Sequence, residues 1–141
     1  MKQKRFLSAA IALLFIVICT TSWVSPKHNL PPGKIAIFAD FSSNTFPSFS
    51  GFFHTTGALI ISGTVTMNVT VIANSTRLRC LMVFTKYETD GTGGTFTAQL
   101  ECSPPDGRWQ IVSGTGAYTH LRGNGVLTMP PGSEAMTGVI Y

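Results

Sequence analysis

The chain has 141 residues, of which 44% are hydrophobic and only 11% are charged. This length accommodates one domain with a sizeable core, and not two. The formal net charge of +4 comes from ten Lys and Arg against six Asp and Glu, but three of the ten lie in the first five residues, so the remainder carries seven against six, or +1. A balance this close to neutral argues against nucleic acid as a partner.

The N-terminal segment has the composition of a secretory signal peptide. A basic tip over residues 1–5 is followed by an apolar run over residues 6–20. Small residues at Thr20 and Ser22 predict cleavage after Ser22, and hence a secreted, periplasmic or extracellular protein with no membrane attachment beyond the signal peptide (residues 1–22). Two alternatives stay open: a lipoprotein attached through Cys19, and an uncleaved anchor, for which the apolar run is short.

The next segments open the mature chain. Residues 23–34 contain three prolines and predict an extended leader, residues 35–39 predict a first strand, and we expect a single domain over residues 35–141. Residues 41–53 contain five phenylalanines without strand or helix period. Either this segment is a loop whose rings plug one end of the core, or it is an exposed aromatic surface for self-association into a homo-oligomer or for an apolar ligand.

The middle of the chain reads as an antiparallel meander. Residues 57–62 predict one strand, and the odd positions of residues 64–73 are apolar between polar neighbours, which is the period of a half-buried strand. If Asn74 and Ser75 form a two-residue hairpin loop, residues whose numbers sum to 149 face each other. Apolar residues of one strand then face apolar residues of the other at each inward position, including Val69 opposite Cys80.

A second loop, centred on Gly91, continues the meander. Opposing residues then sum to 182, which pairs Met82 with Leu100 and places Cys80 beside Cys102. Directly opposed residues on one face can carry a disulfide, and export to an oxidising compartment favours one. The alternative is two free buried thiols that behave as small hydrophobes.

Two asparagines fit the N-glycosylation pattern. Asn68 and Asn74 are each followed, two residues later, by Thr. Glycans would be added there only in a eukaryotic host, and the signal peptide has a bacterial character. We therefore expect both side chains to be bare.

A glycine-rich stretch follows the predicted strand at residues 108–113, which carries Trp109 and Ile111 on one face. Residues 114–125 contain four of the fourteen glycines. A phosphate-binding loop is excluded because no helix-forming segment follows it. These glycines instead indicate strand bends and close backbone approaches, as at the corner of a barrel.

The same stretch carries a family resemblance. Gly114-Thr115-Gly116, the aromatic Tyr118 and Arg122-Gly123 match the Gly-Thr-Gly-x-aromatic-x-x-x-Arg-Gly signature of dirigent proteins. With Gly94-Thr95-Phe96 before it, the run also resembles small bacterial secreted proteins of unknown function that have the related allene oxide cyclase-like barrel. The resemblance covers residues 94–127.

The resemblance implies an all-β fold, a single eight-stranded antiparallel barrel of the calycin-like kind, often oligomeric, with an apolar interior. A barrel of that size can enclose one small ligand or be filled by side chains. In the plant relatives the cavity steers a reactive intermediate toward one stereochemical product. Our strand count agrees, with strands predicted at residues 35–39, 57–62, 64–73, 77–87, 94–102, 108–113, 117–129 and 135–141.

No catalytic constellation stands out. No histidine has metal-ligand spacing to Cys, Asp or Glu, so we expect neither a metal nor a cofactor. We interpret Glu88 and Glu101 as solvated carboxylates. We therefore predict a secreted barrel that holds a small apolar ligand; a self-associating structural module and a dirigent- or cyclase-like isomerase are the alternatives. For Tyr118 and Arg122 we favour structural roles, a packed ring and a guanidinium bound to backbone carbonyls, with a role in a pocket as the alternative. The predicted ligand-binding wall consists of Val65, Val69, Met82, Phe84, Leu100, Trp109, Tyr118 and Arg122.

Overall fold

The protein is described from a computed structural model that covers residues 32–88, 93–130 and 133–141. The predicted signal peptide, nearly all of the leader and the loop centred on Gly91 lie outside the described residues.

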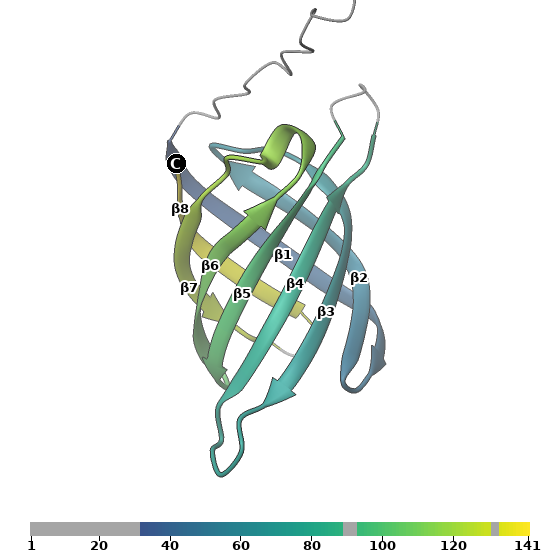
Figure 1. Ribbon diagram of the computed structural model, residues 1–141, viewed down its shortest axis with the longest axis vertical. Coiled ribbons are helices and arrows are strands. Elements are labelled where there is room, and N and C mark those ends of the chain that lie inside the picture. Colours follow the sequence, from purple (N-terminus) through teal and green to yellow (C-terminus); the bar gives the residue numbers. More distant parts are fainter. Residues whose placement is uncertain (1–31, 89–92, 131–132) are drawn as a thin grey trace, which may run out of the picture.

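The chain forms a closed antiparallel barrel in which each strand pairs with the next and the last pairs with the first (Figure 1). The predicted eight-stranded all-β barrel is confirmed. Its elements are β1 (Gly33–Thr45), β2 (Ser48–Gly57), β3 (Ser62–Val71), β4 (Leu78–Lys86), β5 (Thr95–Ser103), β6 (Asp106–Gly114), the short 3₁₀ helix η1 (Gly116–Tyr118), β7 (Gly123–Thr128) and β8 (Ser133–Ile140).

Alternation of apolar and polar residues builds the barrel wall. Along β5, and along β3 as far as Met67, every second residue is buried, and those between them face solvent or are half-buried. Closure leaves no strand with an unpaired edge, so the apolar side of every strand faces one shared interior. The buried core includes Ile37, Phe53, Val65, Met82, Phe84, Phe96, Leu100, Trp109, Leu127 and Met136.

The hairpin between β3 and β4 has the predicted register. Val71 pairs with Leu78 and Val69 pairs with Cys80. The connection is longer than the predicted two residues, since β3 ends at Val71 and β4 begins at Leu78. Within it, the Ile72 N–H donates to the Arg77 carbonyl at 3.2 Å. Asn74 adopts a φ of 58° in this turn, a conformation that asparagine tolerates better than most residues.

The predicted pairing of the two cysteines is wrong by two residues. Cys80 lies opposite Leu100, and Cys102 lies opposite Leu78. The two side chains are therefore diagonal neighbours on the same inward face, and both are free thiols, so the predicted disulfide is not formed. A shift of two residues keeps every side chain on its face, so alternation alone does not detect it. On the other side of β5, Trp109 lies opposite Leu100.

The phenylalanine-rich segment is a hairpin and not a loop. Residues 41–53 form the end of β1 and the start of β2, and the register shifts between Phe41 and Ser43. This β-bulge breaks the two-residue period that would have revealed the strands. The rings consequently divide: Phe53 is buried, Phe41 and Phe49 are partly buried, and Phe46 and Phe52 are exposed.

The strand predicted at residues 57–62 is a loop between β2 and β3. β2 ends at Gly57, whose φ of 96° suits glycine. The loop folds Leu59 into the core. The buried hydroxyl of Thr55 donates to the Leu59 carbonyl at 2.6 Å and accepts from the Ile61 N–H at 3.0 Å. The loop is thus held by hydrogen bonds to the Thr55 side chain and not by the backbone hydrogen bonds of a strand.

The strand predicted at residues 117–129 is shorter and is preceded by η1. The glycines before it serve the predicted role of close approach, because a side chain at Gly114 would collide with the Tyr118 carbonyl, and one at Gly94 with the Thr115 carbonyl. Gly116 adopts a positive φ of 56°. The glycine-rich corner therefore lets η1 lie directly against the β5–β6 end of the barrel (Figure 1).

The barrel has two ends with different contents. At the end that carries η1 and the C-terminus in Figure 1, the interior is filled by Phe53, Phe84, Phe96 and Tyr118, which we call the aromatic end. The opposite end, where β1 meets β2 and β3 meets β4, holds Cys80, Cys102 and Glu134, and we call it the acid end. None of the helices among the described residues has the length and apolar character needed to span a membrane.

Candidate functional site

The aromatic end is closed by packed rings. Phe84 stacks on Phe96 with centroids 4.7 Å apart, and Phe53 meets Phe84 edge-on at 5.0 Å. Tyr118, delivered by η1, meets Phe96 edge-on at 5.7 Å. All four rings are buried. Stacked and edge-on rings are favourable arrangements, so this end is a packed core.

The predicted ligand-binding wall falls mostly inside the core. Six of its eight members belong to the buried cluster, and Val69 packs against that cluster. Arg122 is the exception, because its side chain is exposed and its Nη1 donates to the carbonyls of Leu121 at 2.8 Å and Thr119 at 3.4 Å. The guanidinium thus holds backbone carbonyls outside the barrel, as the structural interpretation of its sequence position expected.

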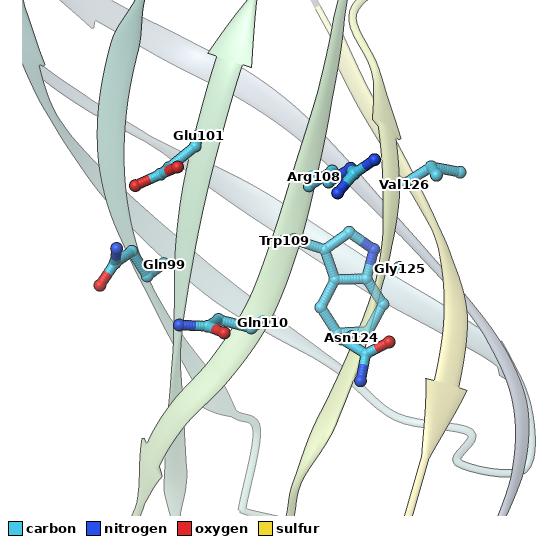
Figure 2. Close-up of a pocket in the computed structure, with 8 residues that line it drawn as sticks. All are labelled: Gln99, Glu101, Arg108, Trp109, Gln110, Asn124, Gly125 and Val126. Atoms are coloured by element: carbon cyan, nitrogen blue, oxygen red, sulfur yellow. The ribbon is translucent and has the colours of Figure 1, made fainter.

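Trp109 is locked across the interior face of two strands. Its indole Nε1 donates to the Thr137 carbonyl of β8 at 3.3 Å. Trp109 pairs with Gly125 of β7, and a side chain at Gly138 would come within 2.8 Å of the indole. Gly138 therefore leaves room for the large ring, and a side chain at Gly125, which lies beside the indole in Figure 2, would collide with the Thr137 carbonyl. Glycine at both positions is thus a packing requirement.

The acid end contains a carboxyl group that our sequence reasoning missed. Glu134 is only 6% exposed, and its Oε2 has no hydrogen bond partner among the described residues. Burial raises the pKa of this carboxyl group from 4.5 to about 7. The signal was present in the sequence: Glu134 shares parity with Met136 and Ile140, the inward residues of β8. Among the glutamates, we interpret only Glu88 and Glu101 from the sequence, both as solvated carboxylates.

Two thiols face the carboxyl group. Burial, then the neighbouring Cys102 and Glu134, raises the pKa of the Cys80 thiol to about 12. Burial also raises the pKa of Cys102, which hydrogen-bonds Cys80. Both are protonated at neutral pH, and a protonated buried thiol is a poor nucleophile. The chemistry available at the acid end therefore belongs to Glu134.

The rim of the acid end is apolar and incompletely covered. Phe41 and Phe49 lie against each other there, with ring centroids 6.1 Å apart. They are partly buried, in contrast to the rings of the aromatic end, as are Val69, Leu78 and Met129. An acceptor without a partner behind an apolar, half-exposed rim has the composition of a small-molecule site.

A second feature lies on the outer wall. A hollow of about 580 Å³ lies over β5, β6 and β7, above Trp109 and Gly125 (Figure 2). Its sides are two rows of outward side chains: Gln99, Gln110 and Asn124 form the amide row, and Glu101, Arg108 and Val126 form the second row. Glu101 accepts from Arg79 at 2.9 Å and lies 3.7 Å from Arg77. Smaller hollows of about 520 and 420 Å³ also open on the outer wall.

In the part of the chain that the structure describes, no three His, Cys, Asp or Glu side chains are grouped to hold a metal ion. No family model matches the sequence, and no curated protein matches it. Among solved structures, the chain is similar to the pterocarpan synthase dirigent protein GePTS1, with a TM-score of 0.46 and 15% sequence identity over 86% of this chain and 92% of that one.

Proposed function

We propose that the barrel binds a small, mainly apolar molecule at its acid end and that Glu134 accepts a hydrogen bond from it. The observation that carries the proposal is the buried Oε2 without a partner. A buried polar group left unsatisfied costs about 1–3 kcal/mol. A ligand that brings a donor to Glu134 recovers part of that cost, whereas a purely apolar molecule does not.

The surroundings of Glu134 define the ligand class. The half-buried rim contributes aromatic and aliphatic surface from Phe41, Phe49 and Leu78. The neighbouring thiols are weak hydrogen bond partners. The matching ligand therefore has an aromatic or aliphatic body and one hydroxyl or amino group.

A matched pair of probes tests this proposal. 4-Propylanisole carries a methyl group in place of the hydroxyl proton of 4-propylphenol and cannot donate a hydrogen bond, so calorimetric titration with both probes tests the hydrogen bond to Glu134. We expect the phenol to bind about tenfold more tightly, since one such bond contributes about 1.4 kcal/mol. Glu134→Leu removes the acceptor and should abolish the difference. Equal affinity of the two probes for the unaltered protein would contradict the proposal.

A catalytic role at the same site is a second candidate. A carboxyl group with a pKa of about 7 both gives and takes a proton near neutral pH, as a general acid or base requires. A dirigent- or cyclase-like reaction would use Glu134 in this way on a bound intermediate. Product stereochemistry in the presence of the protein and of its Glu134→Gln variant tests it, and an unchanged product ratio with the variant excludes Glu134.

Self-association through the phenylalanine-rich hairpin is a third candidate. Phe46 and Phe52 support it, because they are 64% and 55% exposed. Phe52→Ser combined with Phe46→Ser should reduce the mass measured by light scattering if these rings form a contact between copies. A monomer before and after substitution rejects the candidate. Phe53 is unsuitable for this test because it is buried in the core.

We further propose that the chain is exported. The basic tip and apolar run over residues 1–20 support it. N-terminal sequencing of the mature protein should begin at Trp23. A protein that retains Met1 in the producing cell contradicts export by cleavage after Ser22.

A further inference from the structure

The strand register aligns three carboxamides on the outer wall. Gln99 of β5 pairs with Gln110 of β6, which pairs with Asn124 of β7. Adjacent strands lie about 4.8 Å apart, so the three carboxamides of the amide row follow one another across the strands along one side of the hollow, as Figure 2 shows. This arrangement comes from the closed sheet and is not readable from three separate strands.

The amide row has unused hydrogen-bonding capacity. Among the described residues, the side chains of Gln99 and Gln110 have no hydrogen bond partner, and Asn124 Nδ2 donates to the Tyr141 hydroxyl at 3.3 Å. Each carboxamide offers two N–H donors and a carbonyl acceptor. Hydroxyl groups, which donate and accept at one atom, match such a row.

The second row adds one available positive charge. Glu101 is held by Arg79 at 2.9 Å, whereas Arg108 has no ion pair within the described ranges. A guanidinium presents a planar fork that binds a carboxylate through two parallel hydrogen bonds. Three amides and a free guanidinium around one hollow therefore favour a ligand with several hydroxyls and a carboxylate.

We propose that this hollow is a binding site for an acidic saccharide, with the sugar hydroxyls on the amide row and a uronate carboxylate on Arg108. The polar lining disfavours an apolar ligand, and one free arginine is too little for a nucleic acid backbone. The site is separate from the acid end, because its side chains point outward while Glu134 points into the barrel.

Calorimetric titration with trigalacturonic acid and with its fully methyl-esterified form tests the proposal. The two probes share the hydroxyls and differ in charge. We expect the acid to bind about tenfold more tightly than the ester, the worth of one charge-assisted pair. Arg108→Gln should remove this preference, and Gln110→Leu should weaken both probes about fivefold. Thr66→Ala, on the outer face of β3 away from the hollow, is the matched control and should change neither.

Three outcomes overturn the proposal: no binding of either probe, equal binding of acid and ester by the unaltered protein, or unchanged binding in Gln110→Leu. Thermal unfolding of each variant, followed by circular dichroism, verifies that the barrel is intact. Glu134→Leu should leave saccharide binding unchanged, so failure at this hollow and failure at the acid end are distinguishable.

Discussion

The two ends of the barrel interior are built from the same eight strands. They differ in how completely their apolar side chains are covered and their polar groups are hydrogen-bonded. At the aromatic end, four buried rings stack or meet edge-on, and η1 and Leu59 complete the packing. At the acid end, Glu134 is buried without a partner for Oε2, and the nearby apolar side chains are only partly covered.

This difference separates stability from function within one core. A closed aromatic cluster has no group left to interact with anything else, so we assign it to holding the barrel together. A buried acid without a partner destabilises the fold, and such costs concentrate at functional sites. The predictions below therefore compare substitutions at the two ends.

The largest effect is expected at the aromatic end. Phe84→Ala removes a fully buried ring that contacts both Phe53 and Phe96, and loss of such a side chain costs about 3–5 kcal/mol. Urea unfolding measures the change in the free energy of unfolding. Phe46→Ala, at an exposed ring, should change it by less than about 0.5 kcal/mol. Equal losses in the two variants would show that the rings of the aromatic end do not carry the stability.

The acid end should make stability fall as the pH rises. Burial raises the pKa of Glu134 from 4.5 to about 7, so between these pH values the unfolded chain ionises while the folded protein stays protonated. Stability from this group is complete below pH 4.5 and is lost as the pH passes about 7, by about 3 kcal/mol in all.

Urea unfolding between pH 4 and pH 8 measures this dependence. Glu134→Gln, which does not titrate, should flatten the decline and be more stable than the unaltered protein at pH 8. The same slope in both proteins would contradict the raised pKa of Glu134.

The thiols should contribute less than the rings. Cys80→Ala removes one sulfur atom from the interior of the acid end, and we expect a loss of roughly 1 kcal/mol in urea unfolding. Because Cys80 and Cys102 are free thiols, Cys80→Ala should behave alike with and without a reducing agent. A loss that appears only without the reducing agent would indicate a disulfide in the unaltered protein.

The smallest effect is expected outside the barrel. Arg122→Ala removes the hydrogen bonds from Nη1 to the Leu121 and Thr119 carbonyls, the first partly buried and the second exposed. Together we expect them to contribute about 0.5–1 kcal/mol. Ligand binding at the acid end should be unchanged. Weaker 4-propylphenol binding in this variant would instead support the predicted role of Arg122 in a ligand site.

The sequence by itself determined which side chains face inward. Alternation placed Val65, Met82 and Phe84 in the interior, and the β3–β4 register follows from it together with a connection centred on Asn74 and Ser75. The spacing of Gly114 and its neighbours also indicated a barrel corner correctly. These inferences succeed because side-chain parity and turn sterics are local properties of the backbone.

Tertiary structure alone decided the features that matter for a site. Because β4 and β5 are shifted by two residues from the predicted register, Cys80 does not pair directly with Cys102. The alternation of apolar and polar residues cannot reveal such a shift, because its period is also two residues. The bulge at Phe41 hid the β1–β2 hairpin. Glu134 became a buried acid only because barrel closure brings β8 against β1, which turns one face of β8 away from water.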